Sequence, residues 1–334
     1  MELKKFLKVC KMHKQSALKN YLRSYMSSNG YKVTSADGYL YCEPKADGVP
    51  VCLTAHMDTV HPQAIKQIVV ERHEGKTIIS SPQGIGGDDK CGVYMIMECV
   101  REGYRPYVVF CEDEEIGCVG AEKFAVSKDI VKLQDCKFIV QLDRRNATDA
   151  VYYDCDNADF EAWVTDVTGY KTAYGTCSDI SVIAPELGVA AVNLSCGYYQ
   201  EHKPEHYVVF EEMENTLQAT KKLIKASADV EQFIYVEAYH YYGGGYGRLW
   251  DDYDYYWQRQ SSASGKTETY DIQWYEEESG NINHSYISAV SQEEAVGKFL
   301  ISHDDLTYGY IWHIDIVQDN ERSEKNGKQK VSCV

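Results

Sequence analysis

The chain has 334 residues, of which 44% are hydrophobic, and it carries a formal net charge of −17 at pH 7. This hydrophobic fraction supports a sizeable core and excludes wholesale disorder, and the length allows two domains or one large domain with an appendage. The acidic balance argues against nucleic acid and anionic membranes as partners, because both attract surfaces rich in Lys and Arg.

The amino-terminal residues and the cysteines indicate a cytoplasmic protein. The first residues contain no apolar run of signal-peptide length, and no later segment approaches the roughly 20 apolar residues of a membrane span. The 12 cysteines include no Cys-x-x-Cys pair, which argues against zinc-ribbon and thioredoxin motifs. We expect reduced thiols, with Cys52 and Cys111 packed as small hydrophobic side chains in buried strands.

Apolar periodicity predicts strands that alternate with helices over the first two-thirds of the chain. Nearly continuous apolar runs predict buried strands at residues 49–55, 107–111, 138–142 and 189–194. Helices are predicted at residues 15–29, from a glycine-rich turn at 84–92 to about residue 101, near 118–127 and at 211–226, and Ser178 or Asp179 is expected to cap another short helix. Shorter strands are predicted at residues 39–42, in a hairpin of 68–71 with 77–80, and as edge strands at 152–154 and 160–164. The alternation indicates an α/β fold with a mostly parallel mixed sheet flanked by helices.

Polar side chains come at or soon after the carboxyl ends of the four buried strands. In chain order they are His56 and Asp58, Glu114 and Glu115, Asp143, and His202. In an open α/β sheet these strand ends share one edge, which is where ligands bind. We therefore expect these groups, which are far apart in the sequence, to meet at one rim of the sheet.

The glycine-rich turn GIGGDDKCG adds two adjacent carboxylates, Asp88 and Asp89, at the start of a helix. One carboxylate can bridge two cations, and a pair bridged in this way lies within about 4 Å, the separation used by two-metal hydrolases. The alternative is an ordinary acidic turn with a helix cap.

Each of the other signals also has an ordinary explanation when it stands alone. An isolated His-x-Asp is usually a surface loop, two consecutive glutamates form a solvated acidic turn, and a single Asp caps a helix. Taken together, two imidazoles and three carboxylates give each of two metals a mixed nitrogen and oxygen shell with an open position for water. Such shells suit zinc, cobalt or manganese, and the ligand types alone do not choose among these ions.

The segments TAHMDTVHP, GIGGDDKCGV, EDEEIG, QLD and GYYQEHKPE resemble, in order, the five motifs of the co-catalytic di-zinc peptidases. That superfamily includes peptidase T, the aminoacylases and the bacterial leucyl aminopeptidases. The resemblance covers roughly residues 1–227 and is closest to the peptidase T-like branch, which combines an Asp-Asp-Lys-x-Gly turn with a Glu-Glu-Ile-Gly turn.

The resemblance implies a metal-binding role for five residues. His56 and Asp143 would bind the first metal, Glu115 and His202 would bind the second, and Asp88 would bridge the two.

Four further residues have implied roles around the metals. Asp58 would orient the first imidazole, and Glu114 would be the general base and acid. Asp89 follows the bridging carboxylate in the turn, and Asp179 is expected to support the site without binding metal.

The implied reaction is hydrolysis of an amide bond in a peptide or an N-acyl amino acid. Asp143 and His202 are 59 residues apart, which leaves no room for the inserted lid or dimerisation domain of roughly a hundred residues that peptidase T and the aminoacylases carry. Relatives without a lid are mostly aminopeptidases, so an aminopeptidase is expected. The alternatives are an N-acyl amino acid amidohydrolase and a catalytically inactive binding protein with the peptidase fold. The sequence does not indicate the oligomeric state.

The composition changes beyond the motifs. We expect a catalytic domain at residues 1–229, a Tyr-rich connecting segment at 230–268, a small α+β domain at 269–319 and a flexible tail at 320–334. The α+β domain is expected to contain strands at 270–275 and 310–317 and a helix that begins with a capping box at 291–294. The Tyr-rich segment would either pack on the first domain or act as a substitute lid.

Overall fold

The structure is a computed structural model that describes residues 2–238, 268–276, 281–289, 295, 298–299 and 311–316. The chain divides into two compact units, Met1–Ala238 and Tyr239–Val334, and each is described by itself.

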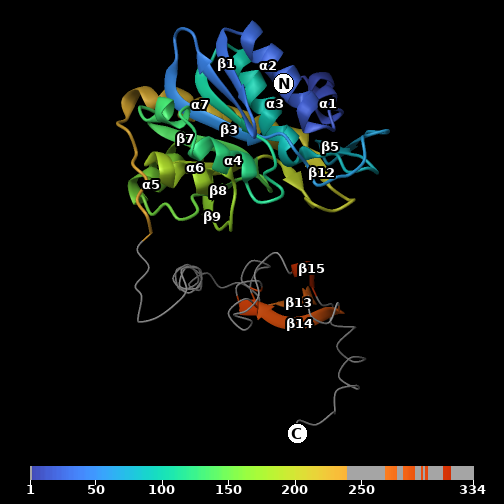
Figure 1. Ribbon diagram of the computed structural model, residues 1–334. Coiled ribbons are helices and arrows are strands. Elements are labelled where there is room, and N and C mark those ends of the chain that lie inside the picture. The colour runs from blue at the N-terminus through green and yellow to red at the C-terminus, as the bar shows by residue number, and fades with distance from the viewer. Residues whose placement is uncertain are drawn as a thin grey trace, which may run out of the picture. The chain divides into compact units, whose positions relative to one another are not determined.

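The first unit is built on an eight-stranded sheet with the strand order β1-β2-β6-β3-β7-β10-β8-β9 (Figure 1). Its strands are β1 (Tyr31–Ala36), β2 (Tyr39–Pro44), β3 (Val49–His56), β6 (Pro106–Cys111), β7 (Phe138–Arg144), β8 (Asp149–Val151), β9 (Lys171–Ala173) and β10 (Ala191–Ser195). The four central strands, β6, β3, β7 and β10, are parallel to one another, and antiparallel pairs occur only toward the two sides of the sheet. The predicted mostly parallel mixed sheet is therefore confirmed.

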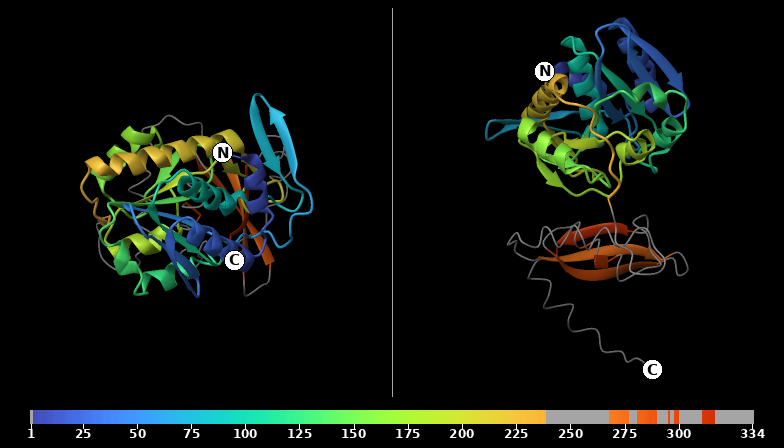
Figure 2. Two further views of the ribbon diagram at one scale, coloured as in Figure 1. Left: turned by 90° about the horizontal axis from the view of Figure 1, so that it is seen from above. Right: turned by 90° about the vertical axis from the view of Figure 1, so that its left-hand side faces the viewer.

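The alternation of side chains along the central strands supplies two hydrophobic cores, one on each face of the sheet. In β7, Phe138 and Val140 belong to one core and Ile139 belongs to the other. The first core is covered by α1 (Leu3–Cys10), α2 (Gln15–Ser28), α3 (Gly87–Arg101), α5 (Ala158–Thr168) and α7 (Phe210–Ala226). The second core is covered by α4 (Val119–Ala125), the 3₁₀ turn η1 (Ile130–Leu133) and α6 (Asp179–Leu187), and Figure 2 shows the helices around the sheet. A second 3₁₀ turn, η2 (Ser227–Asp229), follows α7.

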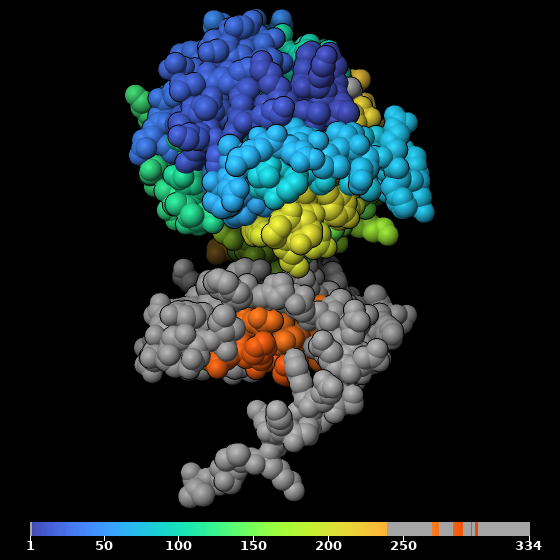
Figure 3. Space-filling model, turned by 90° about the vertical axis from the view of Figure 1, so that its right-hand side faces the viewer, coloured from blue at the N-terminus to red at the C-terminus, as the bar shows by residue number. Residues whose placement is uncertain are grey.

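A smaller antiparallel sheet in the same unit has the order β11-β12-β5-β4. Its strands are β4 (Val69–His73), β5 (Lys76–Ser80), β11 (Tyr198–Tyr199) and β12 (Tyr207–Val209). The β4–β5 hairpin turns at Glu74 and Gly75, whose φ angles of 49° and 82° match the left-handed turn that suits a two-residue hairpin loop. Figure 3 shows this hairpin, in cyan, against the yellow segment that contains β11 and β12.

The predicted strand at residues 160–164 is wrong, because this segment lies inside helix α5. The Asn157 side chain accepts a hydrogen bond from the Phe160 backbone N–H at 3.0 Å and so caps the helix. Phe160 and Val164, one helical turn apart, are both buried. Their aromatic and β-branched character suggests a strand, but packing on the first core favours the helix. The strand predicted at residues 152–154 is also wrong, since the nearest strand, β8, ends at Val151.

The other predicted elements of the first unit are present, with ends that shift by a few residues. The expected cap of the short helix is Ser178, which forms a capping box with Ser181 at the start of α6. Helix α1 and strand β1 were not predicted from the sequence. None of the helices in the described residues combines the length and the apolar composition that a membrane crossing requires.

The described part of the second unit contains a three-stranded antiparallel sheet of order β14-β13-β15. Its strands are β13 (Glu268–Glu276), β14 (Asn281–Ala289) and β15 (Ile311–Ile316). The strands predicted at 270–275 and 310–317 correspond to β13 and β15. The Tyr-rich segment from residue 239 onward, the capping box at 291–294 and the tail at 320–334 lie outside the described residues.

The helical assignment of residues 158–168 is testable through its cap. Replacing Asn157 with Ala removes the acceptor for the Phe160 N–H and should lower the free energy of unfolding by about 1 kcal/mol. Asn157→Asp is the matched control, because it keeps the acceptor and loses only the hydrogen bond that the amide donates to the Ile234 carbonyl. Urea unfolding followed by circular dichroism measures both variants, and equal losses would contradict the cap.

Candidate metal centre

The residues expected at the site meet at the carboxyl end of the central strands. His56 is the last residue of β3, and Asp143 lies at the end of β7. Glu114 and Glu115 follow β6, Asp88 and Asp89 occupy the first turn of α3, and His202 lies between β11 and β12. Because β6, β3 and β7 run parallel, the residues at their carboxyl ends lie at one edge of the sheet.

His56, Asp88 and Asp143 form the first group of candidate ligands. The His56 side chain is fully buried, and its Nε2 lies 2.9 Å from Asp88 Oδ1 and 3.4 Å from Asp143 Oδ1. Its other ring nitrogen, Nδ1, lies 3.1 Å from Asp58 Oδ1. If Nδ1 carries the proton and donates to Asp58, Nε2 remains free to bind a cation.

Asp88, Glu115 and His202 form the second group. His202 Nε2 lies 2.9 Å from Glu115 Oε2 and 3.4 Å from Asp88 Oδ2. Asp88 therefore directs one carboxylate oxygen toward His56 and the other toward His202. Within each group, the three candidate ligand atoms lie within 4.8 Å of one another. The structure thus brings together all five residues expected to bind metal.

Asp58 connects the end of β3 to the acidic turn. Besides facing His56, its carboxylate accepts hydrogen bonds from the backbone N–H groups of Glu114 and Glu115, at 3.2 and 3.1 Å. The buried Lys90 ammonium holds the same segment by donating to the carbonyl oxygens of Met57 and Asp58, at 2.5 and 2.8 Å. Lys90 was not singled out from the sequence, although it stands in the Asp-Asp-Lys turn.

Asp89 faces away from both groups. Its two oxygens accept the backbone N–H groups of His56, at 3.2 Å, and Gly92, at 2.9 Å. The peptide bond between Asp88 and Asp89 is cis, and both residues have backbone angles outside the helical region. The helix can pass close to β7 here because Gly92 has no side chain: an added Cβ would lie 2.0 Å from the Leu142 carbonyl oxygen.

Asp143 is held by three side chains that sequence reasoning did not identify. Its Oδ2 accepts hydrogen bonds from Ser178 Oγ at 2.8 Å and Gln141 Nε2 at 3.0 Å. The Tyr198 hydroxyl lies 3.3 Å from Oδ1, the oxygen that faces His56. Gln141 stands in the QLD motif, and Ser178 was noticed only as a helix cap. These contacts fix the orientation of a carboxylate that would bind metal.

Asp179 lies at the start of α6 and is fully buried. Neither of its carboxylate oxygens accepts an N–H or O–H hydrogen bond from the described residues, and the Cys111 thiol is its polar neighbour. Burial, with a contribution from Asp143, raises the pKa of Asp179 to about 7. The residue is not part of either group of three.

Burial and crowding raise the pKa of several carboxyl groups at the site. Burial raises the pKa of Glu114 to about 10, and the neighbouring Asp143, Asp179 and Asp88 contribute to the increase. Burial likewise raises the pKa of Asp143 to about 6. Carboxylates that are crowded in a buried site resist ionisation unless cations compensate them. Two imidazoles and three carboxylates with these separations fit a pair of divalent ions with mixed nitrogen and oxygen ligands.

A second pair of histidines lies beside the turn that carries Asp88. His61 Nε2 and His206 Nδ1 are 3.2 Å apart, and the added Cβ of a side chain at Gly87 would lie 2.9 Å from His206 Nε2. Burial lowers the pKa of His206 to about 4 and also lowers the pKa of His61, so both rings are neutral near pH 7. An added Cβ at Gly84 would overlap the His61 ring, and one at Gly87 would crowd Val208 and His206, so these two positions of the turn exclude side chains.

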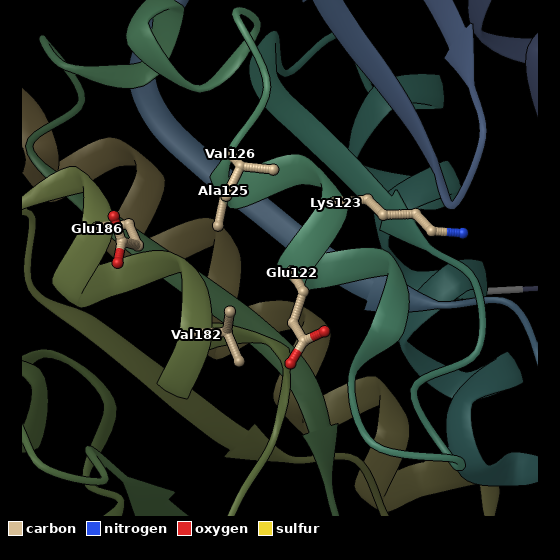
Figure 4. Close-up of a pocket in the computed structure, with 6 residues that line it drawn as sticks. All are labelled: Glu122, Lys123, Ala125, Val126, Val182 and Glu186. Carbon is tan, nitrogen blue, oxygen red and sulfur yellow. The ribbon is translucent and has the colours of Figure 1, made fainter.

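A surface pocket lies away from these groups. It has a volume of about 470 Å³ and opens between α4 and α6 (Figure 4). Its lining residues are Glu122, Lys123, Ala125, Val126, Val182 and Glu186. None of the candidate ligands lines this pocket.

Comparison with solved structures identifies proteins of similar fold. The aminopeptidase PepT from Bacillus cereus is 16% identical with a TM-score of 0.55, and the match covers 68% of this chain and 98% of that one. A tripeptidase from Staphylococcus aureus is 15% identical with a TM-score of 0.55 and the same coverage of the two chains. No protein-family model matches the sequence, and no curated protein matches it. The chain therefore contains the zinc-peptidase fold that its motifs predict.

Proposed function

We propose that this protein is a metal-dependent hydrolase of peptide bonds and, more specifically, an aminopeptidase. The observation that carries the proposal is the position of Asp88, whose two carboxylate oxygens face two separate groups of candidate ligands. One carboxylate shared between two such groups is the arrangement that a co-catalytic metal pair requires.

The proposal assigns His56 and Asp143 to one ion, Glu115 and His202 to the other, and Asp88 to both. Divalent ions bound there would polarise a substrate carbonyl and lower the pKa of a water molecule toward neutrality. The protein contributes the orientation of each ligand. Asp58 fixes the His56 ring, and the hydrogen bonds to Asp143 Oδ2 leave its other oxygen directed at the site.

Glu114 is the general base and acid in this proposal. Its Oε2 lies 3.9 Å from His56 Nε2, beside the first group of ligands, and its side chain is 15% exposed. Asp58 accepts a hydrogen bond from the Glu114 backbone N–H and so fixes the backbone that carries this side chain. The Glu114 carboxylate would take a proton from the attacking water and return it to the leaving nitrogen.

The connection between Asp143 and His202 supports an aminopeptidase. Its elements, β8, α5, β9, α6, β10 and β11, all belong to the two sheets of the first unit and the helices that cover them. This connection therefore adds no separate domain over the site. The two similar structures are those of an aminopeptidase and a tripeptidase, which is consistent with a substrate that has a free amino terminus.

The shared role of Asp88 predicts how metal binding responds to its loss. Asp88→Asn replaces a carboxylate that serves both groups and should reduce bound zinc from two ions per chain to one or none, with affinity weakened more than about 100-fold. Equilibrium dialysis followed by elemental analysis gives the stoichiometry. Asp159→Asn, which changes an exposed carboxylate on α5, is the control, and an unchanged stoichiometry in Asp88→Asn would contradict the bridge.

The role of Glu114 is tested by the isosteric variant Glu114→Gln. It should bind metal as the wild type does but hydrolyse peptides about 10²–10⁴-fold more slowly, because the amide cannot accept the proton. Steady-state rates on a leucyl anilide and metal content of the same samples measure both properties. Glu122→Gln, an exposed position on α4, should retain the full rate, and full activity in Glu114→Gln would refute the assignment.

Substrate class is tested by pairing each peptide with its N-acetylated form. The proposal expects release of the amino-terminal residue from free peptides and no cleavage of the blocked ones, with activity lost on addition of a chelator. Cleavage of N-acetyl amino acids in place of free peptides would show an amidohydrolase and overturn the aminopeptidase assignment. A zinc-loaded protein that cleaves neither class would overturn the hydrolase proposal.

A further inference from the structure

Two cysteine side chains meet beside the general base. Cys118, which precedes α4, and Cys177, which precedes the cap of α6, have their sulfur atoms 3.6 Å apart. Cys118 Sγ also lies 3.8 Å from Glu114 Oε1, and Cys177 Sγ lies 3.4 Å from Ser181 Oγ. The pair therefore links the turn after β6 to the turn before α6.

Cys177 differs from the other cysteines of the described residues in being exposed. Cys118 is buried directly behind it. One accessible thiol with a second thiol within reach is the arrangement in which an attacking cysteine is followed by a resolving cysteine. Cys52 and Cys111 are buried in their strands, as expected from the sequence, although the Cys111 thiol also faces Asp179.

We propose that Cys118 and Cys177 form a thiol–disulfide exchange site that reacts with small disulfides and controls the environment of Glu114. The first part of the proposal concerns the two thiols alone. The second part, control of hydrolysis, rests on the proposed function.

The local hydrogen bonds favour Cys177 as the attacking group. The Cys118 thiol, with help from the Ser181 hydroxyl, lowers the pKa of Cys177 to about 6, whereas the same contact raises the pKa of Cys118. The thiolate is the nucleophile in disulfide exchange, so the lowered pKa and the exposure of Cys177 both favour it as the attacking group.

The reaction proceeds in two exchange steps. The Cys177 thiolate attacks one sulfur of the small disulfide, forms a mixed disulfide and releases one small thiolate. Cys118 then attacks Cys177 Sγ, the Cys118–Cys177 bond forms, and the second small thiolate leaves with the proton of the Cys118 thiol. Two protein thiols are oxidised, and one small disulfide is reduced to two thiols.

Oxidation alters the surroundings of two site residues. The sulfur atoms must close from 3.6 Å to the disulfide length of about 2.05 Å, which moves Cys118 Sγ away from its position 3.8 Å from Glu114 Oε1. On the other side, Cys177 adjoins Ser178, whose hydroxyl holds Asp143. Helices α4 and α6, which begin next to the two cysteines, pack side by side (Figure 4). Closure of the pair therefore pulls on Glu114 from one side and on Asp143 from the other.

The exchange site is tested on the full-length protein with oxidised glutathione as the probe. After alkylation of free thiols, peptide mapping without reductant should show an intramolecular link between Cys118 and Cys177. Cys118→Ser should trap glutathione on Cys177, Cys177→Ser should form neither product, and Cys155→Ser should behave as the wild type. A lasting glutathione adduct in the wild type, a link to another cysteine such as Cys333, or no reaction would overturn the proposal.

Control of hydrolysis is measured on the same samples. The oxidised wild type should hydrolyse peptides about 10- to 100-fold more slowly, because small displacements of a catalytic group have effects of this size, and dithiothreitol should restore the rate. Cys177→Ser should keep its rate in glutathione disulfide. Disulfide formation without a change in rate would overturn the control of Glu114. A protein that forms the disulfide but hydrolyses peptides in neither state would contradict the proposed function and leave the exchange site established.

Discussion

The Asp88 carboxylate is the group on which the geometry of the site depends. A side chain can serve two cation positions only if its two oxygens face both of them, and Asp88 meets this requirement: its oxygens face His56 and His202. In contrast, both oxygens of the neighbouring Asp89 accept hydrogen bonds from backbone N–H groups, those of His56 and Gly92. Asp89 therefore holds the turn in place, and Asp88 faces the candidate ligands.

Much of the site could be predicted because strand ends in a parallel sheet converge. His56, Glu115 and Asp143 follow continuous apolar runs, so their position at one edge required no knowledge of side-chain packing. The position of His202 was harder to predict, because this residue lies in a turn of the smaller sheet that no apolar run precedes. The order of the five motifs supplied that position, and the distance from His202 to Glu115 agrees with it.

The features that could not be predicted depend on contacts between distant segments. Phe160 and Val164 favour a strand by composition, yet they lie one turn apart in a helix because both pack on the first core. Lys90 was overlooked because its role is to hold two carbonyl oxygens more than thirty residues earlier in the chain. Cys118 and Cys177 are 59 positions apart, and only the packing of α4 against α6 places their sulfur atoms together.

The two groups of candidate ligands differ in solvent exposure, because one ligand of the second group, His202, comes from the smaller sheet. His56 and Asp143 belong to the rigid central strands, and their side chains are 0% and 6% exposed. The His202 side chain is 56% exposed and extends from the turn between two short strands of the small sheet. A ligand that is exposed in this way leaves the position it serves open to solvent, whereas the position beside His56 and Asp143 is enclosed by protein. In the proposed di-metal site, the ion beside His202 would therefore exchange more readily than the ion beside His56.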